Sequence, residues 1–375
     1  MQAETAVLAS GGGLKIPMSD LPSLRGVRVL VTGHTGFKGS WLCAWLKRDG
    51  AEVAGFALAP EPNDQPNLFA AADIAEGMRS RIGDIRDFDL VEREFREFQP
   101  EVVFHLAAQP LVRRSYRDPL ATFSTNVMGT AHVLEAARRC ASVRAIVCVT
   151  TDKVYDNKEW VWGYREDDPL GGADPYSASK AAAEIVAGSY RRALLPLDDN
   201  RIALATARGG NVVGGGDWSE DRLVPDIVRF INAGQPIVLR NPGAVRPWQH
   251  VLELVGGYVT LAHRLLAHPA QAADAWNFGP GRDNEVDVER LARSFAQAYG
   301  DESARIEIVP SPLKEANFLK LDIAKSTMLL GWRPRLGFER TIGLTAEWYR
   351  GFHRDGLAAS GLVTRQIEAY LELGG

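Results

Sequence analysis

The feature that most constrains the fold is a set of three glycines, spaced three positions apart, between a short β-branched segment and a helical one. The segment RVLVT at 28–32 has the composition of a buried strand, and glycines follow at positions 33, 36 and 39 before a helical pattern that Gly50 ends. In a dinucleotide-binding unit, the first glycine makes a tight turn, the second admits a pyrophosphate to backbone N–H groups, and the third allows close helix–strand packing. A plain turn has no need of three glycines, so the segment predicts a phosphate-binding turn. The residues expected to hold a cofactor there are Gly33, Thr35, Gly36, Phe37, Lys38 and Gly39.

Strand and helix patterns continue to alternate through the first half of the chain. Further strands are expected at 52–58, 102–107, 143–149 and 201–208, and helices at 88–98, from Asn126 onward and from Tyr176 onward. Repeated β-α-β units with short connections predict an α/β fold with a Rossmann-like, doubly wound parallel sheet. The remaining cofactor contacts are expected at strand ends and at the start of one helix: Asp84, Ile85, Ala107, Ala108, Gln109 and Asn126.

The second expected strand lacks the usual signal for the adenosine ribose. A carboxylate commonly ends this strand in NAD-binding proteins, whereas residues 57–60 read ALAP. An arginine that could receive a 2′-phosphate is equally absent from these four positions. The strand therefore does not decide between NAD and NADP, and NAD is favoured by default.

The domain organisation follows from where the alternation stops. The chain has 375 residues, enough for one large or two moderate domains. Residues 23–210 are expected to form the dinucleotide-binding Rossmann domain, with 250–280 returning to it. The Pro-rich, irregular segments 211–249 and 281–355 are expected to form a smaller substrate-binding lobe, with a flexible leader at 1–22 and a C-terminal tail at 356–375.

Composition excludes several other classes of protein. The net charge of −4 and the lack of a Lys/Arg cluster argue against a nucleic-acid partner. No apolar run approaches the ~18 residues of a membrane span, and the N-terminus does not resemble a secretory signal, so a cytoplasmic location is expected. The cysteines and histidines are scattered without metal-ligand spacing, so no metal site is indicated.

Residues 150–180 offer the most reactive side chains. Thr151, Asp152 and Lys153 follow the strand at 143–149, and the carboxyl ends of parallel strands face the ligand crevice. Tyr176 and Lys180 lie one turn apart on one face of an Ala-rich helix. A phenolate base at neutral pH requires about 4 kcal/mol of preferential stabilisation, which an ammonium group and a cofactor cation could supply together. A Tyr–Lys pair at this spacing is also common on helix surfaces, so its meaning depends on the surrounding fold.

Polar residues of the second half are candidates for substrate binding. Asn211 precedes Gly214–Gly216, where a side chain would obstruct a phosphate or sugar, and Arg246 beside a proline could clamp a diphosphate through two parallel hydrogen bonds. The full set of substrate-binding candidates is Asn211, Arg222, Arg240, Arg246 and His250.

Several motifs in combination resemble the extended short-chain dehydrogenase/reductase family, and most closely its CDP-glucose 4,6-dehydratase members. They are TGHTGFKGSWL, HLAAQPLVR, STNVMGT, TTDKVYDNKEW, DPYSASK, RGGNVVGGGDW and RPWQHV, and the resemblance runs from about residue 28 to about residue 348. The residue pair after the threonine is Asp-Glu in dTDP-glucose dehydratases, whereas this chain has Asp152-Lys153. This difference points to the branch that acts on CDP-sugars.

The resemblance implies a lyase that retains NAD through its cycle and converts CDP-glucose to CDP-4-keto-6-deoxyglucose. Tyr176, assisted by Lys180 and Thr151, would remove the hydroxyl proton at carbon 4 while hydride passes to NAD. Water would then leave across carbons 5 and 6, with Asp152 as the acid and Lys153 as the base, before hydride returns to carbon 6. A lysine base must be held neutral by burial or by nearby cations.

The resemblance also implies a homodimer, or a dimer of dimers, formed by the helices that begin near Asn126 and Tyr176. Two alternatives stay open from the residues alone. One is another nucleotide-sugar 4,6-dehydratase or a 4-epimerase on the same scaffold, although an epimerase has no need of the Asp152-Lys153 pair. The other is a dinucleotide-binding sensor without catalysis, although a sensor has no need of an assembled proton relay.

Overall fold

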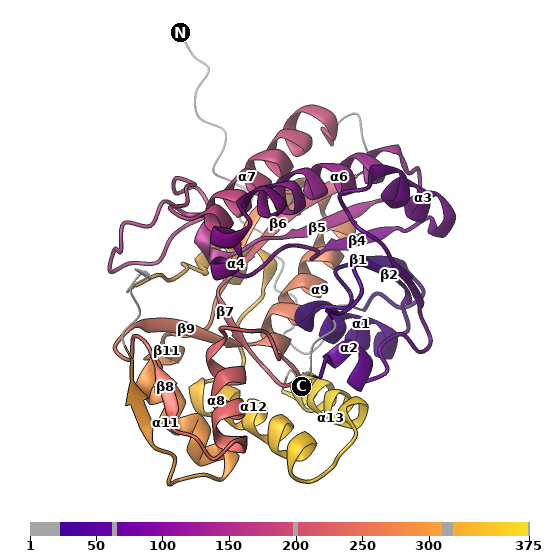
Figure 1. Ribbon diagram of the computed structural model, residues 1–375. Coiled ribbons are helices and arrows are strands. Elements are labelled where there is room, and N and C mark those ends of the chain that lie inside the picture. The colour runs from indigo at the N-terminus through magenta and orange to yellow at the C-terminus, as the bar shows by residue number, and fades with distance from the viewer. Residues whose placement is uncertain (1–22, 62–65, 198–201, 310–317, 374–375) are drawn as a thin grey trace.

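A computed structural model describes residues 23–61, 66–197, 202–309 and 318–373, so the expected leader lies outside the described residues. Its centre is a parallel sheet of seven strands in the order β10-β6-β5-β4-β1-β2-β3 (Figure 1). The order runs outward in both directions from β1 and β4, which confirms the doubly wound Rossmann sheet. The strands are β1 (Arg28–Thr32), β2 (Glu52–Ala57), β3 (Arg79–Ile82), β4 (Val102–His105), β5 (Ala145–Val149), β6 (Ala203–Gly209) and β10 (Ala275–Phe278).

Helices cover both faces of this sheet. Figure 1 shows α3 (Phe88–Phe98), α6 (Gly129–Arg139) and α7 (Pro175–Ser189) on one face and α1 (Phe37–Asp49) and α9 (Val251–Ala267) on the other. The alternation of β1 divides its side chains between the two layers: Val29 and Val31 belong to the core beneath α1 and α9, whereas Leu30 belongs to the core beneath α3 and α6. Burial of each such side chain contributes about 1.5–3 kcal/mol.

Local signals fix the ends of the two helices that matter most for the site. Helix α1 ends at Gly50, whose φ of 85° places it in the left-handed conformation that glycine adopts without strain. Helix α7 begins after Asp174, whose carboxylate accepts a hydrogen bond of 3.0 Å from the Ser177 N–H. Pro175 occupies the first helical position, where its lack of an N–H group leaves no donor without a partner. Tyr176 is therefore held in the first turn of α7.

The expected helix start at Asn126 was wrong. Asn126 lies within a π-helical turn, η1 (Ser124–Met128), which connects α5 (Pro119–Phe123) to α6 without a break. The helical segment begins instead after Asp118, whose carboxylate accepts a hydrogen bond of 3.1 Å from the Ala121 N–H. An aspartate followed by proline is a strong start signal, and it precedes the expected start by eight positions.

A smaller group of strands and helices lies beside the carboxyl ends of the sheet (Figure 1). It contains a three-stranded sheet in the order β11-β9-β7 and a parallel pair, β8 and β12. Its strands are β7 (Asn211–Val213), β8 (Ile237–Leu239), β9 (Val245–His250), β11 (Glu285–Asp287) and β12 (Ile306–Ile308), and its helices are α8 (Leu223–Asn232), α11 (Val288–Tyr299) and α12 (Phe338–His353). The shorter elements elsewhere are α2 (Leu68–Ala71), α4 (Val112–Arg117), η2 (Asp152–Val154), η3 (Tyr190–Leu194), α10 (Pro269–Ala272), η4 (Arg282–Asn284) and η5 (Ser326–Leu330).

The segment set apart as a C-terminal tail contains helix α13 (Ala359–Glu372). Leu362 and Ile367 of this helix are buried, and the Tyr370 hydroxyl donates a 2.8 Å hydrogen bond to Glu253 of α9. Figure 1 shows α13 beside α1 and α2, so the C-terminal segment packs against the helix that follows the glycine turn. Within the described ranges, no helix has both the length and the apolar character needed to cross a membrane.

Candidate functional site

A cavity of about 910 Å³ lies at the carboxyl ends of the sheet strands, between the sheet and the smaller group of elements. Its lining combines the glycine turn, the ends of β2, β4 and β5, the start of α7 and parts of the smaller group. The predicted site residues that line it are Gly33, Thr35, Gly36, Phe37, Lys38, Gly39, Asp84, Ile85, Ala107, Ala108, Thr151, Asp152, Lys153, Tyr176, Asn211, Arg222, Arg240 and Arg246. Ligands of doubly wound sheets bind at this edge, so the structure brings most of the predicted residues to one ligand-binding position.

The backbone of the glycine turn packs as closely as it does only because Gly33 and Gly39 lack side chains. Gly33 has a φ of 79°, and a Cβ there would lie 2.7 Å from the Ala107 nitrogen. A Cβ on Gly39 would lie 2.1 Å from the Gly33 carbonyl oxygen. Helix α1 begins directly after Gly36 with no side chain capping its first N–H groups. These groups and the helix dipole suit a pyrophosphate, so the turn fits a dinucleotide.

The expected adenosine end of the cavity is held by backbone and small residues. Thr35 donates from its hydroxyl to the Leu58 carbonyl oxygen at 2.9 Å, which ties the glycine turn to the end of β2. Asp84 accepts two hydrogen bonds from the Arg86 guanidinium, at 2.8 and 2.6 Å, and this arginine lowers the pKa of the Asp84 carboxyl. Asp84 is therefore an ionised group at the cavity wall and keeps its place through Arg86.

Gln109 and Asn126 lie behind the cavity wall. The Asn126 side chain accepts a 2.8 Å hydrogen bond from the Gln109 N–H and donates to the Gln109 carbonyl oxygen at 3.1 Å. Its amide nitrogen also donates to the Ser179 hydroxyl of α7 at 2.8 Å. The structure thus places these two residues where they fix the loop after β4 against α7.

Four predicted catalytic residues meet at the end of β5. The Thr151 hydroxyl donates to Asp152 Oδ1 at 3.0 Å, and a side-chain hydrogen bond joins Thr151 to Tyr176. Lys153 Nζ lies 3.6 Å from the same Asp152 oxygen. A Cβ on Gly210 would lie 3.0 Å from Asp152 Oδ2, so this glycine keeps open the space that the carboxylate faces. Hydroxyl, carboxylate, amine and phenol therefore lie together on the wall of one cavity.

The Tyr176 phenol is not activated by the protein alone. Burial raises its pKa, and the hydrogen bond with Thr151 and the charge of Arg222 oppose this only in part. Lys180 is buried one turn further along α7 and donates from Nζ to the Val149 carbonyl oxygen at 3.2 Å. Burial lowers the pKa of Lys180. The expected lowering of the phenol pKa thus requires more than the ammonium group, which leaves a part for a cofactor cation.

Lys38 belongs to the reactive end of the cavity as well as to the glycine turn. Its pKa is lowered to about 7, mainly by burial and also by the charges of Lys180 and Arg222, while the charges of Asp152 and Asp217 act in the opposite direction. Lys38 was expected only as a cofactor contact. Its electrostatic coupling to Asp152 and Lys180 depends on the tertiary fold and has no local signal in the sequence.

Arginines line the side of the cavity formed by the smaller group of elements. The charge of Arg222 acts on both Lys38 and Tyr176, so Arg222 faces the reactive end. Arg240 Nη1 donates to Asp221 Oδ1 at 3.0 Å, and Arg113 Nη1 of α4 lies 3.4 Å from the same oxygen. Arg113 and Asp221 were not predicted as site residues, although the two adjacent arginines at 113 and 114, shortly after the loop Ala108-Gln109-Pro110, were a usable signal.

His250 does not reach the cavity. Its side chain is fully buried, and Nδ1 accepts a 3.3 Å hydrogen bond from the Leu252 N–H, which caps the start of α9. Burial lowers the pKa of His250 to about 3, so the ring is neutral at physiological pH. The expected substrate contact is replaced by a structural role, because His250 is the N-cap of α9 and its ring is buried.

Comparison with known proteins gives relatives over most of the chain. The family model described as GDP-mannose 4,6 dehydratase matches residues 30–345. A CDP-glucose 4,6-dehydratase of Salmonella typhimurium is 46% identical over 340 residues, which cover 90% of this chain and 94% of the relative. A UDP-glucose 4-epimerase of Mycolicibacterium smegmatis is 32% identical, with 86% of this chain and 99% of the relative covered.

A solved structure supports the same relationship. The dTDP-glucose 4,6-dehydratase of Streptomyces venezuelae, crystallised with NAD and TYD bound, has a TM-score of 0.75 and 28% identity, covering 88% of this chain and 98% of its own. The matched region contains the glycine turn, the end of β5 and the start of α7, which together form the cavity described above. The chain belongs to the GDP-mannose 4,6-dehydratase family of extended short-chain dehydrogenases/reductases.

Proposed function

We propose that the protein is an NAD-dependent CDP-glucose 4,6-dehydratase that forms CDP-4-keto-6-deoxyglucose. The observation that carries this proposal is the Asp152-Lys153 pair beside Tyr176 in a chain 46% identical to a CDP-glucose 4,6-dehydratase. A 4-epimerase of this family requires only the Tyr and Lys of α7. An acid and a base at the end of β5 are useful where water must be eliminated.

NAD is the cofactor that the glycine turn and the family favour. We propose that its pyrophosphate lies against the turn at 33–39, its adenosine near Asp84 and Ile85, and its nicotinamide end near Tyr176 and Lys180. When bound, NAD would supply a reversible hydride acceptor for the oxidation at carbon 4 and the reduction at carbon 6 of the sugar.

The side chains at the end of β5 and the start of α7 handle the protons. Tyr176 accepts the proton of the hydroxyl at carbon 4, and the Thr151 hydroxyl keeps the phenol oriented through their hydrogen bond. The ketone formed at carbon 4 acidifies the proton on carbon 5. Asp152, in its protonated form, gives its proton to the hydroxyl that leaves carbon 6, and Lys153 accepts the proton from carbon 5, so that one molecule of water is lost. Lys153 returns this proton to carbon 5 when carbon 6 is reduced, and the proton held by Tyr176 replaces the one that Asp152 gave up.

The surroundings of Lys153 depend on bound substrate and cofactor. The side chain is 33% exposed and lies beside Asp152, which is 1% exposed. The partly exposed position of Lys153 on the cavity wall allows bound substrate to cover it. The cations that line the same cavity, among them Lys38 and Arg222, supply a positive surrounding once water is excluded.

Arginines of the smaller group are the proposed contacts of the diphosphate. Arg222, Arg240 and Arg246 line the cavity, and a guanidinium group matches phosphate geometry through parallel hydrogen bonds. Asp221 holds Arg240 and Arg113 near one another at the cavity edge, so a diphosphate would compete with this carboxylate. Asn211 completes the set on the side of β7.

Incubation with nucleotide sugars tests the function directly. The purified protein is given CDP-glucose, dTDP-glucose, UDP-glucose or GDP-mannose without added reductant, and the 4-keto sugar is followed by its absorbance in alkali. Conversion of CDP-glucose is the expected result. Conversion of another nucleotide sugar would move the protein to a sister branch, formation of a 4-epimer would make it an epimerase, and no conversion at all would favour a dinucleotide-binding sensor.

We further propose that the protein is a homodimer built on α5, η1 and α7. Apolar side chains are exposed on these elements, with Leu120 81%, Met128 51% and Ile185 60% exposed. Leu120→Asp with Ile185→Asp should convert the dimer to a monomer in light scattering. Leu329→Asp, at a residue of η5 that is 64% exposed, is the matched control and should leave the dimer intact. A dimer of dimers and a cytoplasmic location stay predictions.

A further inference from the structure

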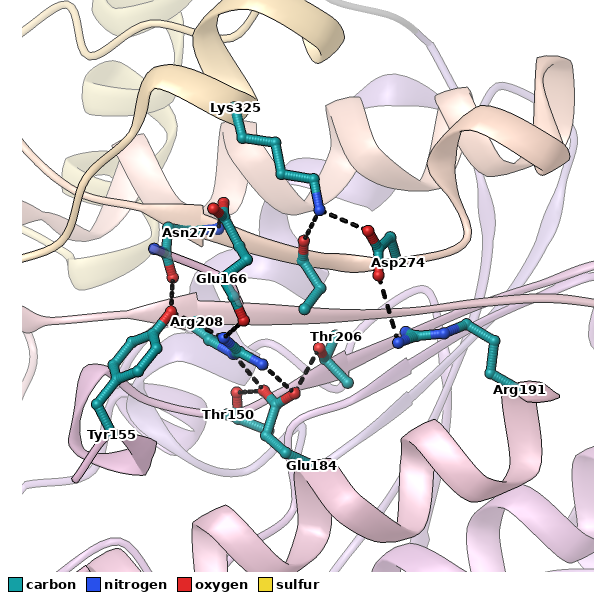
Figure 2. Close-up of polar contacts among 11 residues, drawn as sticks. Thr150, Tyr155, Glu166, Glu184, Arg191, Thr206, Arg208, Asp274, Asn277 and Lys325 are labelled. Carbon is teal, nitrogen blue, oxygen red and sulfur yellow. Dashed lines mark hydrogen bonds and ion pairs between the residues drawn. The ribbon is translucent and has the colours of Figure 1, made fainter. Parts of the chain in front are cut away.

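A buried polar network lies beneath the cavity, with a Glu184–Arg208 ion pair at its centre (Figure 2). Arg208 Nε donates to Glu184 Oε1 at 3.0 Å and Nη2 donates to Oε2 at 2.9 Å. The two side chains are only 3% and 4% exposed, and neither lines the cavity. The pair is therefore outside the site assigned above and has no access to substrate.

Glu184 connects the two elements that carry the catalytic residues. It lies one turn after Lys180 on α7, and its Oε1 accepts a 2.5 Å hydrogen bond from the Thr150 hydroxyl. Thr150 directly precedes Thr151, Asp152 and Lys153 at the end of β5. Figure 2 shows Thr150 and Thr206 approaching the Glu184 carboxylate from neighbouring strands, with Thr206 donating to Oε2 at 2.8 Å.

Arg208 extends the same network to the chain that follows the catalytic segment. Its Nη1 donates to the Tyr155 hydroxyl at 2.8 Å and to the Glu166 carbonyl oxygen at 2.9 Å, and its guanidinium lies 5.0 Å from the centre of the Tyr155 ring. Tyr155 in turn donates to Asn277 of β10 at 2.7 Å. Residues 152–154 are thus held between Thr150 on one side and Tyr155 on the other.

Stability alone does not account for this arrangement. Removing two charges from water costs several kcal/mol each, and well-packed apolar residues of similar volume are commonly as stabilising as a buried ion pair. A buried network whose oxygens are all satisfied has a different property, because it permits only one geometry. Both Glu184 oxygens accept two hydrogen bonds each, one from a threonine and one from Arg208.

We propose that Glu184 and Arg208 are positioning residues of the dehydratase reaction, which lock the end of β5, through Thr150, onto helix α7. Their role is to fix Thr151 and Asp152 relative to Tyr176 and Lys180, and this inference rests on the catalytic roles proposed above. A displacement of about 1 Å between groups that transfer protons can cost about 100-fold in rate. By fixing the position of the end of β5 relative to α7, Glu184 and Arg208 therefore affect the rate although they do not contact the substrate.

Two threonines of the network provide a matched test. Thr150→Val and Thr206→Val each remove one hydroxyl hydrogen bond to the same carboxylate and keep the side-chain shape. Only Thr150 adjoins the catalytic segment, whereas Thr206 lies inside β6 and does not line the cavity. Thr150→Val should lower kcat about ten-fold or more with the KM for CDP-glucose and the NAD affinity unchanged, while Thr206→Val stays within about two-fold of the parent. Thr150→Ser keeps the hydroxyl and should restore kcat.

Glu184→Gln distinguishes positioning from a direct role of Thr150, because Glu184 is remote from substrate. A fall in kcat is expected in Glu184→Gln as well as in Thr150→Val, because the amide replaces one of the two oxygens that accept from Arg208 and the threonines with an NH₂ donor. The proposal is overturned if Thr150→Val and Thr206→Val lose the same activity, or if folded Glu184→Gln retains the parent kcat. Should Glu184→Gln not fold, the threonine comparison and the serine rescue decide. A parent protein that converts no nucleotide sugar would instead refute the proposed function.

Discussion

Acid should destabilise this protein through histidines that the fold buries in their neutral form. His105 of β4 is 2% exposed and lies between two threonine hydroxyls, 2.7 Å from Thr32 Oγ1 and 3.0 Å from Thr130 Oγ1. Burial lowers its pKa from 6.5 to about 3, and burial likewise lowers the pKa of His34 to about 4 and that of His250 to about 3. The unfolded chain therefore binds more protons than the folded chain below pH 6.5, and the free energy of unfolding falls as pH decreases.

The size of the effect follows from these values. Between about pH 7 and about pH 5 an unfolded histidine becomes almost fully protonated while the folded one stays neutral, which costs about 2 kcal/mol for each residue. The three histidines together would cost about 6 kcal/mol, a large share of the 5–15 kcal/mol that typically separates folded from unfolded domains. The loss begins near pH 6.5 and continues until the folded-state pKa values are reached.

Urea unfolding of the parent and of His105→Gln measures this contribution. Glutamine can hydrogen-bond to the threonines but does not titrate, so the variant should lose about 2 kcal/mol less than the parent between pH 7 and pH 5. The comparison concerns the slope with pH, so a lower stability of the variant at pH 7 does not affect it. Equal losses in the two proteins over this range would refute the reasoning.

Three further predictions concern the cavity. Lys153→Met should leave NAD affinity unchanged and lower turnover of CDP-glucose by about 100-fold or more, because elimination loses its base, and unchanged turnover would remove Lys153 from the mechanism. The Lys38 pKa of about 7 means that its ammonium is lost as pH rises, so the NAD affinity of the parent, measured by calorimetry, should weaken above pH 7 by at most about ten-fold per pH unit. Lys38→Met should abolish this pH dependence. Gly39→Ala should abolish NAD binding, because its Cβ would lie 2.1 Å from the Gly33 carbonyl oxygen, whereas Gly343→Ala on α12, whose Cβ meets nothing within 4 Å, should bind NAD as the parent does.

The elements predicted well are those whose hydrophobic periodicity and end signals lie within one continuous segment of the sequence. Strand β1 and helix α3 begin and end at the expected residues, because periodicity and end signals coincide in each. Strand β3 was not expected. Its sequence RSRI alternates two arginines with small or apolar residues, and the structure explains these charges, since Arg79 and Arg81 both pair with Glu94 of α3. An edge strand that depends on ion pairs with a helix carries little local strand signal.

Side-chain direction explains the main failure at the site. His250 follows Arg246 by four positions along β9, and both were expected at the substrate. Strand alternation alone would send them to the same face, yet His250 is the last residue of β9 and the N-cap of α9. The change from strand to helix at this point decides the orientation of the ring, and the sequence gives only the residues, not the angle between the two elements.

Helix α7 shows how far a local pattern can reach. Tyr176, Lys180 and Glu184 recur at intervals of four, which places all three on one stripe of the helix, and all are at least 92% buried. The stripe leads from the cavity wall at Tyr176, through the Lys180 ammonium bound to the end of β5, to the carboxylate that holds Thr150. The spacing makes Glu184 detectable in the sequence as the third member of the Tyr–Lys series. Its partner Arg208 comes 24 positions later on β6 and is joined to it only by the sheet, so the link between catalytic helix and catalytic strand emerges from the tertiary fold.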